Sequence, residues 1–287
     1  MDGVKPVFLE CWPGGLETFS GGTRTQVKLR RPWQRDIEGD PAECQLCTRV
    51  QKEVGFEREG GEWWGIIENL FTPLSFHRMV LPKEHWDKDR MRRLGGRAGI
   101  LSALNVVDRQ VRRSGTPSER LYVAVHVGAL AGQTQSHLHW NFYKPPSSRA
   151  APESEKEVEF ELREAWKKNP SLRLFEHHGL AAFVGGIRAG QCFIVRKPGL
   201  SLPDFPGESL GELLGRITEL YADRFRSDQG LAPDYMIGAV IKQSRWLYAV
   251  YVPILNQWGV DQQLCLLEGT PLVLPWPHRE TVRHLRP

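Results

Sequence analysis

The stretch from Thr134 to Tyr143 (TQSHLHWNFY) constrains the fold of this chain more than any other. Apolar and polar side chains alternate along it, and a period of two predicts a β-strand with one buried face. The apolar positions are Leu138, Trp140 and Phe142, and the polar positions are His137, His139 and Asn141. The strand therefore presents two imidazoles and an amide in a row on its other face.

The two histidines are expected to have different functions. Neighbouring side chains on one face of a strand lie roughly 6.5 to 7 Å apart, which is too far for one metal ion to bind both comfortably. One histidine can anchor the strand while the other acts on a substrate. Taken alone, the pair also fits a half-exposed sheet face or a simple metal site. The preceding segment from Gly128 to Gln133 is small and glycine-containing, so its backbone N–H groups can approach an anion such as phosphate.

Composition places the chain among ordinary globular proteins. It has 287 residues, of which 40% are hydrophobic and 25% charged, and a formal charge of +4 spread along the sequence. We therefore expect small anionic ligands and no binding to polymeric nucleic acid. The N-terminus lacks the apolar core of a signal peptide, and no run approaches the ~20 apolar residues of a membrane span, which predicts a cytoplasmic protein without a membrane partner.

Five widely spread cysteines argue against a disulfide framework, but Cys44 and Cys47 form a C-x-x-C pair. Such a pair is half of a zinc site or a redox pair. Zinc is favoured, because the residues before Cys44 do not form the buried strand that precedes a thioredoxin-like site. A tetrahedral zinc ion needs two more ligands, for which histidines are the candidates. Residues 10–42, including the basic segment around Arg31, show little periodicity and are expected to form an irregular arm.

Periodicity predicts the other elements of the first half. Strands are expected at 62–69, 76–81 and 121–127, and an amphipathic helix at 101–113. His85 follows the second of these strands at a proline-defined turn, a position fixed enough for a metal ligand.

Residues 144–154 have the composition of a linker. Beyond it, helices are predicted at 155–168 and 209–226, and strands at 181–187, 191–197, 235–242, 246–254 and 263–267. The pattern is similar to that of the first half, but no second H-x-H pair follows. We therefore expect a first domain at 1–143 and a second at 155–287 that repeats its fold without its chemistry.

Five motifs in one order give a more specific indication. They are Arg31-Pro-Trp-Gln34, Cys44-x-x-Cys47, Ile67-Glu-Asn-Leu-Phe71, Leu81-Pro-Lys-Glu-His85 and Gly132-Gln-Thr-Gln-Ser-His-Leu-His139-x-Asn141. In this order and spacing, residues 30 to 143 resemble the histidine-triad superfamily. Within it, the resemblance is to the branch of galactose-1-phosphate uridylyltransferases and diadenosine polyphosphate phosphorylases.

The resemblance implies an α+β fold of two histidine-triad-like halves, each an antiparallel sheet with packed helices, the second catalytically empty. It also implies a structural zinc ion bound by Cys44, Cys47, His85 and His137, with His139 as the nucleophile and Asn141 beside it. Substrate contacts are expected from Arg31, Asn69, Phe71, Gly132, Thr134 and Gln135. Family sites are completed by a neighbouring subunit, which predicts a homodimer.

Two positions depart from the family pattern. The third motif position is glutamine in the transferases and histidine in the hydrolases, but here it is Asn141. An amide donates a hydrogen bond to phosphate but offers no proton to a leaving group, so Asn141 favours transfer. Its side chain is one methylene shorter than that of glutamine. His126 stands where the uridylyltransferases carry asparagine.

The sequence thus predicts a nucleotidyltransferase that moves a nucleoside monophosphate from a nucleotide sugar or dinucleotide to a sugar 1-phosphate or phosphate through a nucleotidyl-histidine. The alternatives are a nucleotide or dinucleotide polyphosphate hydrolase of the same superfamily and a catalytically idle nucleotide-binding protein.

Overall fold

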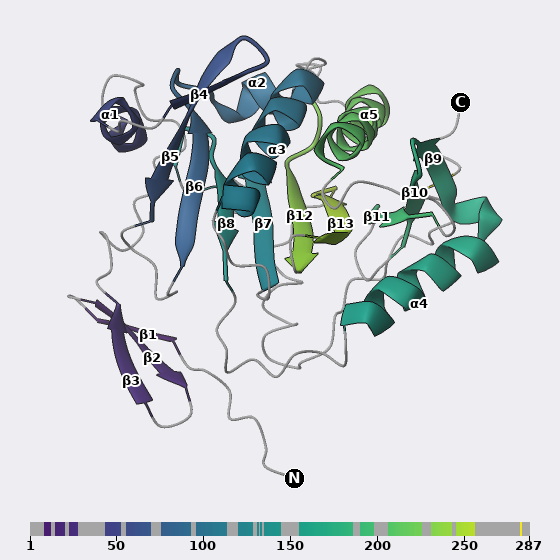
Figure 1. The fold of residues 1–287 in the computed structure, drawn as a ribbon, viewed down its shortest axis with the longest axis horizontal. Helices are drawn as coiled ribbons and strands as arrows, with labels where there is room; N and C mark the ends of the chain where they lie inside the picture. Colours follow the sequence, from purple (N-terminus) through teal and green to yellow (C-terminus); the bar gives the residue numbers. More distant parts are fainter. Residues whose placement is uncertain are drawn as a thin grey trace.

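The protein has the predicted α+β fold, dominated by one large antiparallel sheet (Figure 1). The computed structural model describes residues 9–12, 15–20, 23–27, 44–52, 56–69, 76–92, 96–113, 120–128, 131, 133, 135–144, 155–185, 190–197, 206–225, 231–242, 245–255 and 282. The predicted strand at 263–267 lies outside these residues.

The large sheet has ten strands in the order β4-β5-β6-β8-β7-β12-β13-β11-β10-β9. Its first five are β4 (Phe56–Glu59), β5 (Glu62–Glu68), β6 (His77–Pro82), β7 (Arg120–Val127) and β8 (Trp140–Tyr143). Its last five are β9 (Arg173–His177), β10 (Leu180–Val184), β11 (Cys192–Arg196), β12 (Tyr235–Lys242) and β13 (Arg245–Pro253). Each run consists of three consecutive strands followed by a swapped pair. The two runs meet where β7 pairs with β12 along their whole lengths, from Val127 opposite Tyr235 to Arg120 opposite Lys242.

Helices α3 (Gly96–Arg113) and α5 (Gly207–Phe225) cover one face of this sheet side by side (Figure 1). They approach closely because residue 211 lacks a side chain: a Cβ on Gly211 would lie 2.8 Å from Cα of Leu101. Beneath them lies the main hydrophobic core, which includes Trp140 and Phe142 of β8. The apolar positions of the H-x-H stretch are therefore buried, as their alternation predicts.

Two other helices pack on the opposite face, near its two ends. Helix α1 (Gln45–Lys52) packs Leu46 and Val50 against Ile67, Met79 and Leu81 of β5 and β6. Helix α4 (Glu155–Lys168) packs Trp166 against Ala181, Phe183 and Val195 of β10 and β11. On the same face, Asn141 and Tyr143 of β8 are only partly buried. The short helices α2 (Lys88–Arg92) and η2 (Pro170–Leu172) complete the described elements.

Two predictions of secondary structure are corrected. The arm at 10–42 is not wholly irregular, since β1 (Leu9–Trp12), β2 (Gly15–Ser20) and β3 (Thr23–Val27) form a separate antiparallel sheet. The strand predicted at 134–143 is shorter, because regular pairing of β8 with β6 and β7 begins only at Trp140. His137 and His139 lie in the segment that leads into β8, and here backbone groups bond outside the sheet, as when the Leu138 N–H donates to the carbonyl of Trp86 at 2.7 Å.

Candidate functional site

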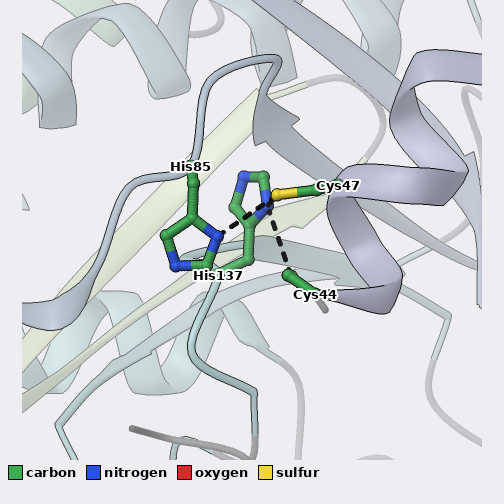
Figure 2. Close-up of side chains that lie close together, drawn as sticks. All are labelled: Cys44, Cys47, His85 and His137. Atoms are coloured by element: carbon green, nitrogen blue, oxygen red, sulfur yellow. Dashed lines mark hydrogen bonds between the residues drawn. The ribbon is translucent and has the colours of Figure 1, made fainter. Parts of the chain in front are cut away.

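The four predicted zinc ligands lie together (Figure 2). The ligand atoms of Cys44, Cys47, His85 and His137 are all within 4.8 Å of one another. Sγ of Cys47 is 3.2 Å from Nδ1 of both His85 and His137, and Sγ of Cys44 is 3.9 Å from Nδ1 of His137. Two thiols and two imidazoles around one point are the donor set of a closed tetrahedral zinc site.

Three separate elements bring these ligands together. Cys44 directly precedes α1 and Cys47 lies in its first turn, and the Thr48 N–H donates to the Cys44 carbonyl. His85 follows β6, and His137 precedes β8. Helix α1 reaches its position because β5 carries glycine beneath it: a Cβ on Gly65 would lie 2.2 Å from Cγ2 of Val50. The cluster therefore depends on a close helix-to-sheet contact.

The environment of His137 suits a metal ligand. Its Nε2 lies 2.9 Å from the carbonyl oxygen of Pro82. The ring donates this N–H to the carbonyl, so that the unprotonated Nδ1 faces the two sulfur atoms. Such a bond fixes the tautomer of a ligating histidine.

The ionisation of the cluster also fits a cation. Burial, with a contribution from Cys44, raises the pKa of Cys47 to about 12. Burial and the neighbouring His85 lower the pKa of His137 to about 3. Both shifts arise because like groups are buried together without a compensating charge. A divalent cation would supply a counter-charge for the thiolates and would need His137 neutral, as it already is.

His139 is positioned differently from His137. Its Nδ1 lies 3.0 Å from the backbone carbonyl oxygen of His137, and it donates its proton there. Burial lowers the pKa of His139, the bond to His137 opposes this shift, and nearby His126 and His77 lower it further. The ring is therefore neutral at pH 7, with its Nε2 lone pair available.

Two further histidines, His77 and His126, interact with His139, and they share one face of the sheet with Asn141. Asn141 pairs with Met79 of β6 and Ala124 of β7. Its Oδ1 lies 2.9 Å from Nε2 of His77, the first residue of β6. His126, near the end of β7, donates from Nδ1 to the carbonyl of Ala131 at 2.6 Å. The side chains around His139 in the described part of the chain are thus imidazoles and amides. None of the hydrogen-bond partners described for them is a carboxylate.

The loop before His137 is braced from within. Gln133 is buried, accepts a hydrogen bond from the N–H of Gly128 at 2.7 Å, and donates to the carbonyls of Gln135 and Ser136. The Gly128 N–H, expected to be available for an anion, is therefore already used. Gly128 has a φ of 96°, and a Cβ there would lie 2.1 Å from the carboxyl carbon of Asp234. Glycine is needed here for close approach to the second half of the sheet.

Two of the predicted substrate residues, Asn69 and Gln135, lie in the described part of the chain. Asn69 directly follows β5, beside His77, and Gln135 is half-buried in the braced loop. Arg31, Phe71, Gly132 and Thr134 lie outside the described residues. Sequence reasoning missed His77, although its alternation with Met79 and Leu81 places it on the face that carries Asn141.

No helix in the described part of the chain is long and apolar enough to cross a lipid bilayer.

Comparison with known proteins supports the fold. No family model matches the sequence, and no curated protein matches it. Solved structures resemble it over most of its length. A uridylyltransferase has a TM-score of 0.60 and 17% identity, covering 90% of this chain and 91% of that one. A GALT-like protein from Arabidopsis thaliana has a TM-score of 0.57 and 17% identity, covering 88% and 92% of the two chains.

An ADP-glucose phosphorylase from Arabidopsis thaliana, solved with bound ADP-glucose, has a TM-score of 0.56 and 16% identity, covering 83% of this chain and 87% of that one. At such identities the likeness shows the fold. The predicted resemblance to uridylyltransferase-like proteins is thus confirmed at the level of the fold, and these neighbours are nucleotidyltransferases and phosphorylases by name.

Proposed function

We propose that this protein is a zinc-containing nucleotidyltransferase in which His139 carries the nucleotide covalently. The observation that carries the proposal is the hydrogen bond from Nδ1 of His139 to the carbonyl of His137. It fixes the ring in the tautomer whose Nε2 is unprotonated, as a nucleophile requires. A half-exposed histidine on a sheet face would have no need of such a constraint.

The reaction proceeds in two displacements. Nε2 of His139 attacks the α-phosphorus of the donor and forms a P–N bond. The bond from this phosphorus to the bridging oxygen breaks, and the distal phosphate or sugar phosphate leaves with the electron pair. In the second displacement an oxygen of the acceptor phosphate attacks the same phosphorus, and Nε2 recovers its lone pair.

Asn141 supports transfer over hydrolysis. It lies two residues beyond His139 along the chain, and its partner His77 interacts electrostatically with His139. Its carboxamide can donate hydrogen bonds to phosphate oxygens in the transition state but has no proton to give a leaving oxygen. A phosphate leaving group needs no such proton, whereas a poorer one does.

The metal would be held by Cys44, Cys47, His85 and His137. Four protein ligands leave no position for substrate, so when bound the ion supplies rigidity and a counter-charge. The residue that links this cluster to the reaction is His137, whose backbone carbonyl accepts the proton of Nδ1 of His139.

The donor we propose is a nucleotide sugar. A solved structure with this fold contains ADP-glucose, and another is named as a uridylyltransferase, which supports this class of donor. The acceptor would be a sugar 1-phosphate or inorganic phosphate.

We also propose that the chain consists of two histidine-triad-like units, a catalytic one at 1–143 and an empty one at 155–287, joined by residues 144–154. The repeated connectivity of the ten-stranded sheet supports this division. In the second unit β13 takes the place of β8 in the strand order, and its sequence RWLYAVYVP contains no histidine.

Intact-mass measurement tests the proposed function. The metal-loaded protein is mixed briefly with UDP-glucose, ADP-glucose or a GDP-sugar and quenched. With at least one donor we expect the added mass of one nucleotidyl group, that is, a nucleoside monophosphate less one water. This mass should be lost again when glucose 1-phosphate or phosphate is added.

The two alternatives give other outcomes. Rapid hydrolysis of the donor without any exchange into added sugar phosphate would support a hydrolase. Binding of nucleotides without an adduct or turnover, for every donor tested, would support an idle nucleotide-binding protein and refute the proposal.

A further inference from the structure

We propose that His77 is a positioning residue that turns the carboxamide of Asn141 so that its NH2 group faces the phosphate of the donor. This inference rests on the proposed function and deepens it, because it assigns a direction to the hydrogen bonds of the phosphate site. His77 and Asn141 lie on neighbouring strands and on one face, as a diagonal pair: His77 is opposite Tyr143, and Asn141 is opposite Met79.

The hydrogen-bonding capacity of the three side chains fixes this direction. Nε2 of His77 is 2.9 Å from Oδ1 of Asn141, and a carbonyl oxygen only accepts, so Nε2 carries the proton. Burial lowers the pKa of His77, so at pH 7 the ring is neutral and its Nδ1 is an acceptor. Nδ2 of Asn69 lies 3.3 Å from both ring nitrogens, and of these only Nδ1 can accept its proton.

The result is a chain of donors that runs in one direction, from Asn69 through His77 to Asn141. Asn69 is itself held in register, because its backbone N–H donates to the carbonyl of His77 at 2.9 Å. With its oxygen occupied by His77, the carboxamide of Asn141 directs its nitrogen, with two N–H donors, away from β6. The oxygens of a phosphate attached to His139 need donors of this kind.

This arrangement explains how the shorter side chain at position 141 is accommodated. An asparagine lacks the extra methylene that would extend the amide toward the phosphate, and a free amide can also rotate to present its oxygen, which would repel the anion. The imidazole of His77, reaching across from β6, excludes that second orientation. Fixing the amide before the substrate binds reduces the entropy lost in the transition state.

Two amide substitutions at position 77 test the inference as a matched pair. Glutamine can place its amide nitrogen near the position of Nε2, whereas the shorter asparagine cannot. We expect His77→Asn to slow formation of the nucleotidyl-enzyme by about 10- to 100-fold, the usual effect of losing an orienting partner, with little change in the donor concentration for half-maximal rate. His77→Gln should stay within about three-fold of the unmodified protein.

A double substitution provides a rescue. In His77→Ala/Asn141→Gln the longer amide can reach the phosphate through the space that the imidazole leaves, so we expect it to recover most of the rate lost in His77→Ala. Equal rates for His77→Asn and His77→Gln, or no loss in His77→Ala, would overturn the inference. At about pH 7.5, where His77 is neutral in the folded and unfolded protein, thermal unfolding and bound metal should differ little among the variants, since a purely structural role would alter the unfolding temperature first.

A measurement on the resting protein separates this inference from the proposed function. Long-range ¹H–¹⁵N correlation spectra report which ring nitrogen of His77 is protonated, and we expect Nε2 in the unmodified protein near neutral pH. Protonation at Nδ1 would reverse the donor chain and overturn the inference even if the enzyme transfers nucleotides. Absence of any adduct in the unmodified protein would instead refute the proposed function, and with it the phosphate as the group that Asn141 faces.

Discussion

The backbone carbonyl of His137 lies 3.0 Å from Nδ1 of His139. The residue whose side chain faces the two cysteines thus also holds the neighbouring imidazole through its main chain. Because His137 is itself bound to the carbonyl of Pro82, the orientation of His139 is linked through the main chain to the Cys/His cluster. The two histidines of the H-x-H pair therefore differ in their surroundings, and neither lies in the regular part of β8.

Replacing His139 should separate catalysis from metal binding. We expect His139→Ala to form no nucleotidyl-enzyme and to reduce turnover by about a thousand-fold or more, while bound metal stays the same. Intact mass and elemental analysis of one preparation measure both. A suitable control is His178→Asn, since His178 is exposed, lies away from the site, and has a φ of 40° that asparagine tolerates. Turnover that survives in His139→Ala would show that another residue is the nucleophile.

Replacing a cysteine of the cluster should remove both metal and stability. Cys44→Ser weakens a buried site in which the remaining ligands are held together by the cation, so we expect loss of bound metal and a fall of about 4 kcal/mol or more in the free energy of unfolding. Denaturant unfolding with elemental analysis measures this. Cys192→Ala is the matched control: Cys192 is also buried, but its Sγ contacts Tyr221, and its loss should lower stability modestly and leave the metal in place. Metal retained in Cys44→Ser would refute the assignment of this ligand.

The contact between Gly65 and Val50 gives a test of how α1 is positioned. A Cβ at residue 65 would lie 2.2 Å from Cγ2 of Val50, so Gly65→Ala should push α1 away from β5 and destabilise the protein by about 1–3 kcal/mol. Metal affinity should fall as well, because Cys44 and Cys47 move with the helix. Adding Val50→Ala provides the space that the new methyl group needs, and the double variant should regain metal affinity. Additive losses in the double variant would mean that the two residues do not meet.

The lowered pKa of His77 predicts an acid-sensitive contribution to stability. The unfolded chain binds a proton at this residue as the pH falls through about 6.5, whereas the folded protein does so only at lower pH. Protonation thus favours unfolding, and the free energy of unfolding should decrease below pH 6.5 by at most about 1.4 kcal/mol per pH unit on account of this group. Denaturant unfolding of the unmodified protein and of His77→Gln over this pH range isolates the effect, with the smaller slope expected for the variant. Parallel curves would show that His77 titrates normally.

Much of the main sheet could be predicted from periodicity because its strands alternate or are continuously apolar. The helix at Glu155–Lys168 and the strand at Tyr235–Lys242 have the predicted bounds, and several others differ by one or two residues. The strands β4 and β9 were missed because both lie at the edges of the sheet, where charged and apolar residues mix. Tertiary contacts hold β4 in place, since Glu57 and Glu59 form salt bridges with Arg109 of α3 at 2.7 and 2.8 Å.

The site could be predicted only where its residues lie in recognisable sequence motifs, and not where they meet through the pairing of strands. Spacing and resemblance identified the four side chains of the Cys/His cluster, because each lies in a short, ordered motif. His77 lies in no such motif, and its contact with Asn141 exists only because β6 and β8 are neighbours in the sheet. The prediction of a regular strand through His137 and His139 was wrong. Alternation of apolar and polar residues indicates which side chains are buried, but it does not show whether the backbone pairs with a neighbouring strand. In this segment the backbone N–H of Leu138 donates a hydrogen bond to the carbonyl of Trp86, which is not in a strand.

The pairing of β7 with β12 has a consequence for how the chain reaches its native state. More than a hundred residues separate Val127 from its partner Tyr235. During synthesis the first five strands therefore emerge before β12, and the apolar strand β7 lies at an unpaired edge of the sheet. Long-range strand pairing of this kind is slow, and an open edge invites association with other chains. The first half of the chain is therefore expected to be prone to aggregation, and to be a substrate for chaperones, until the second half has left the ribosome.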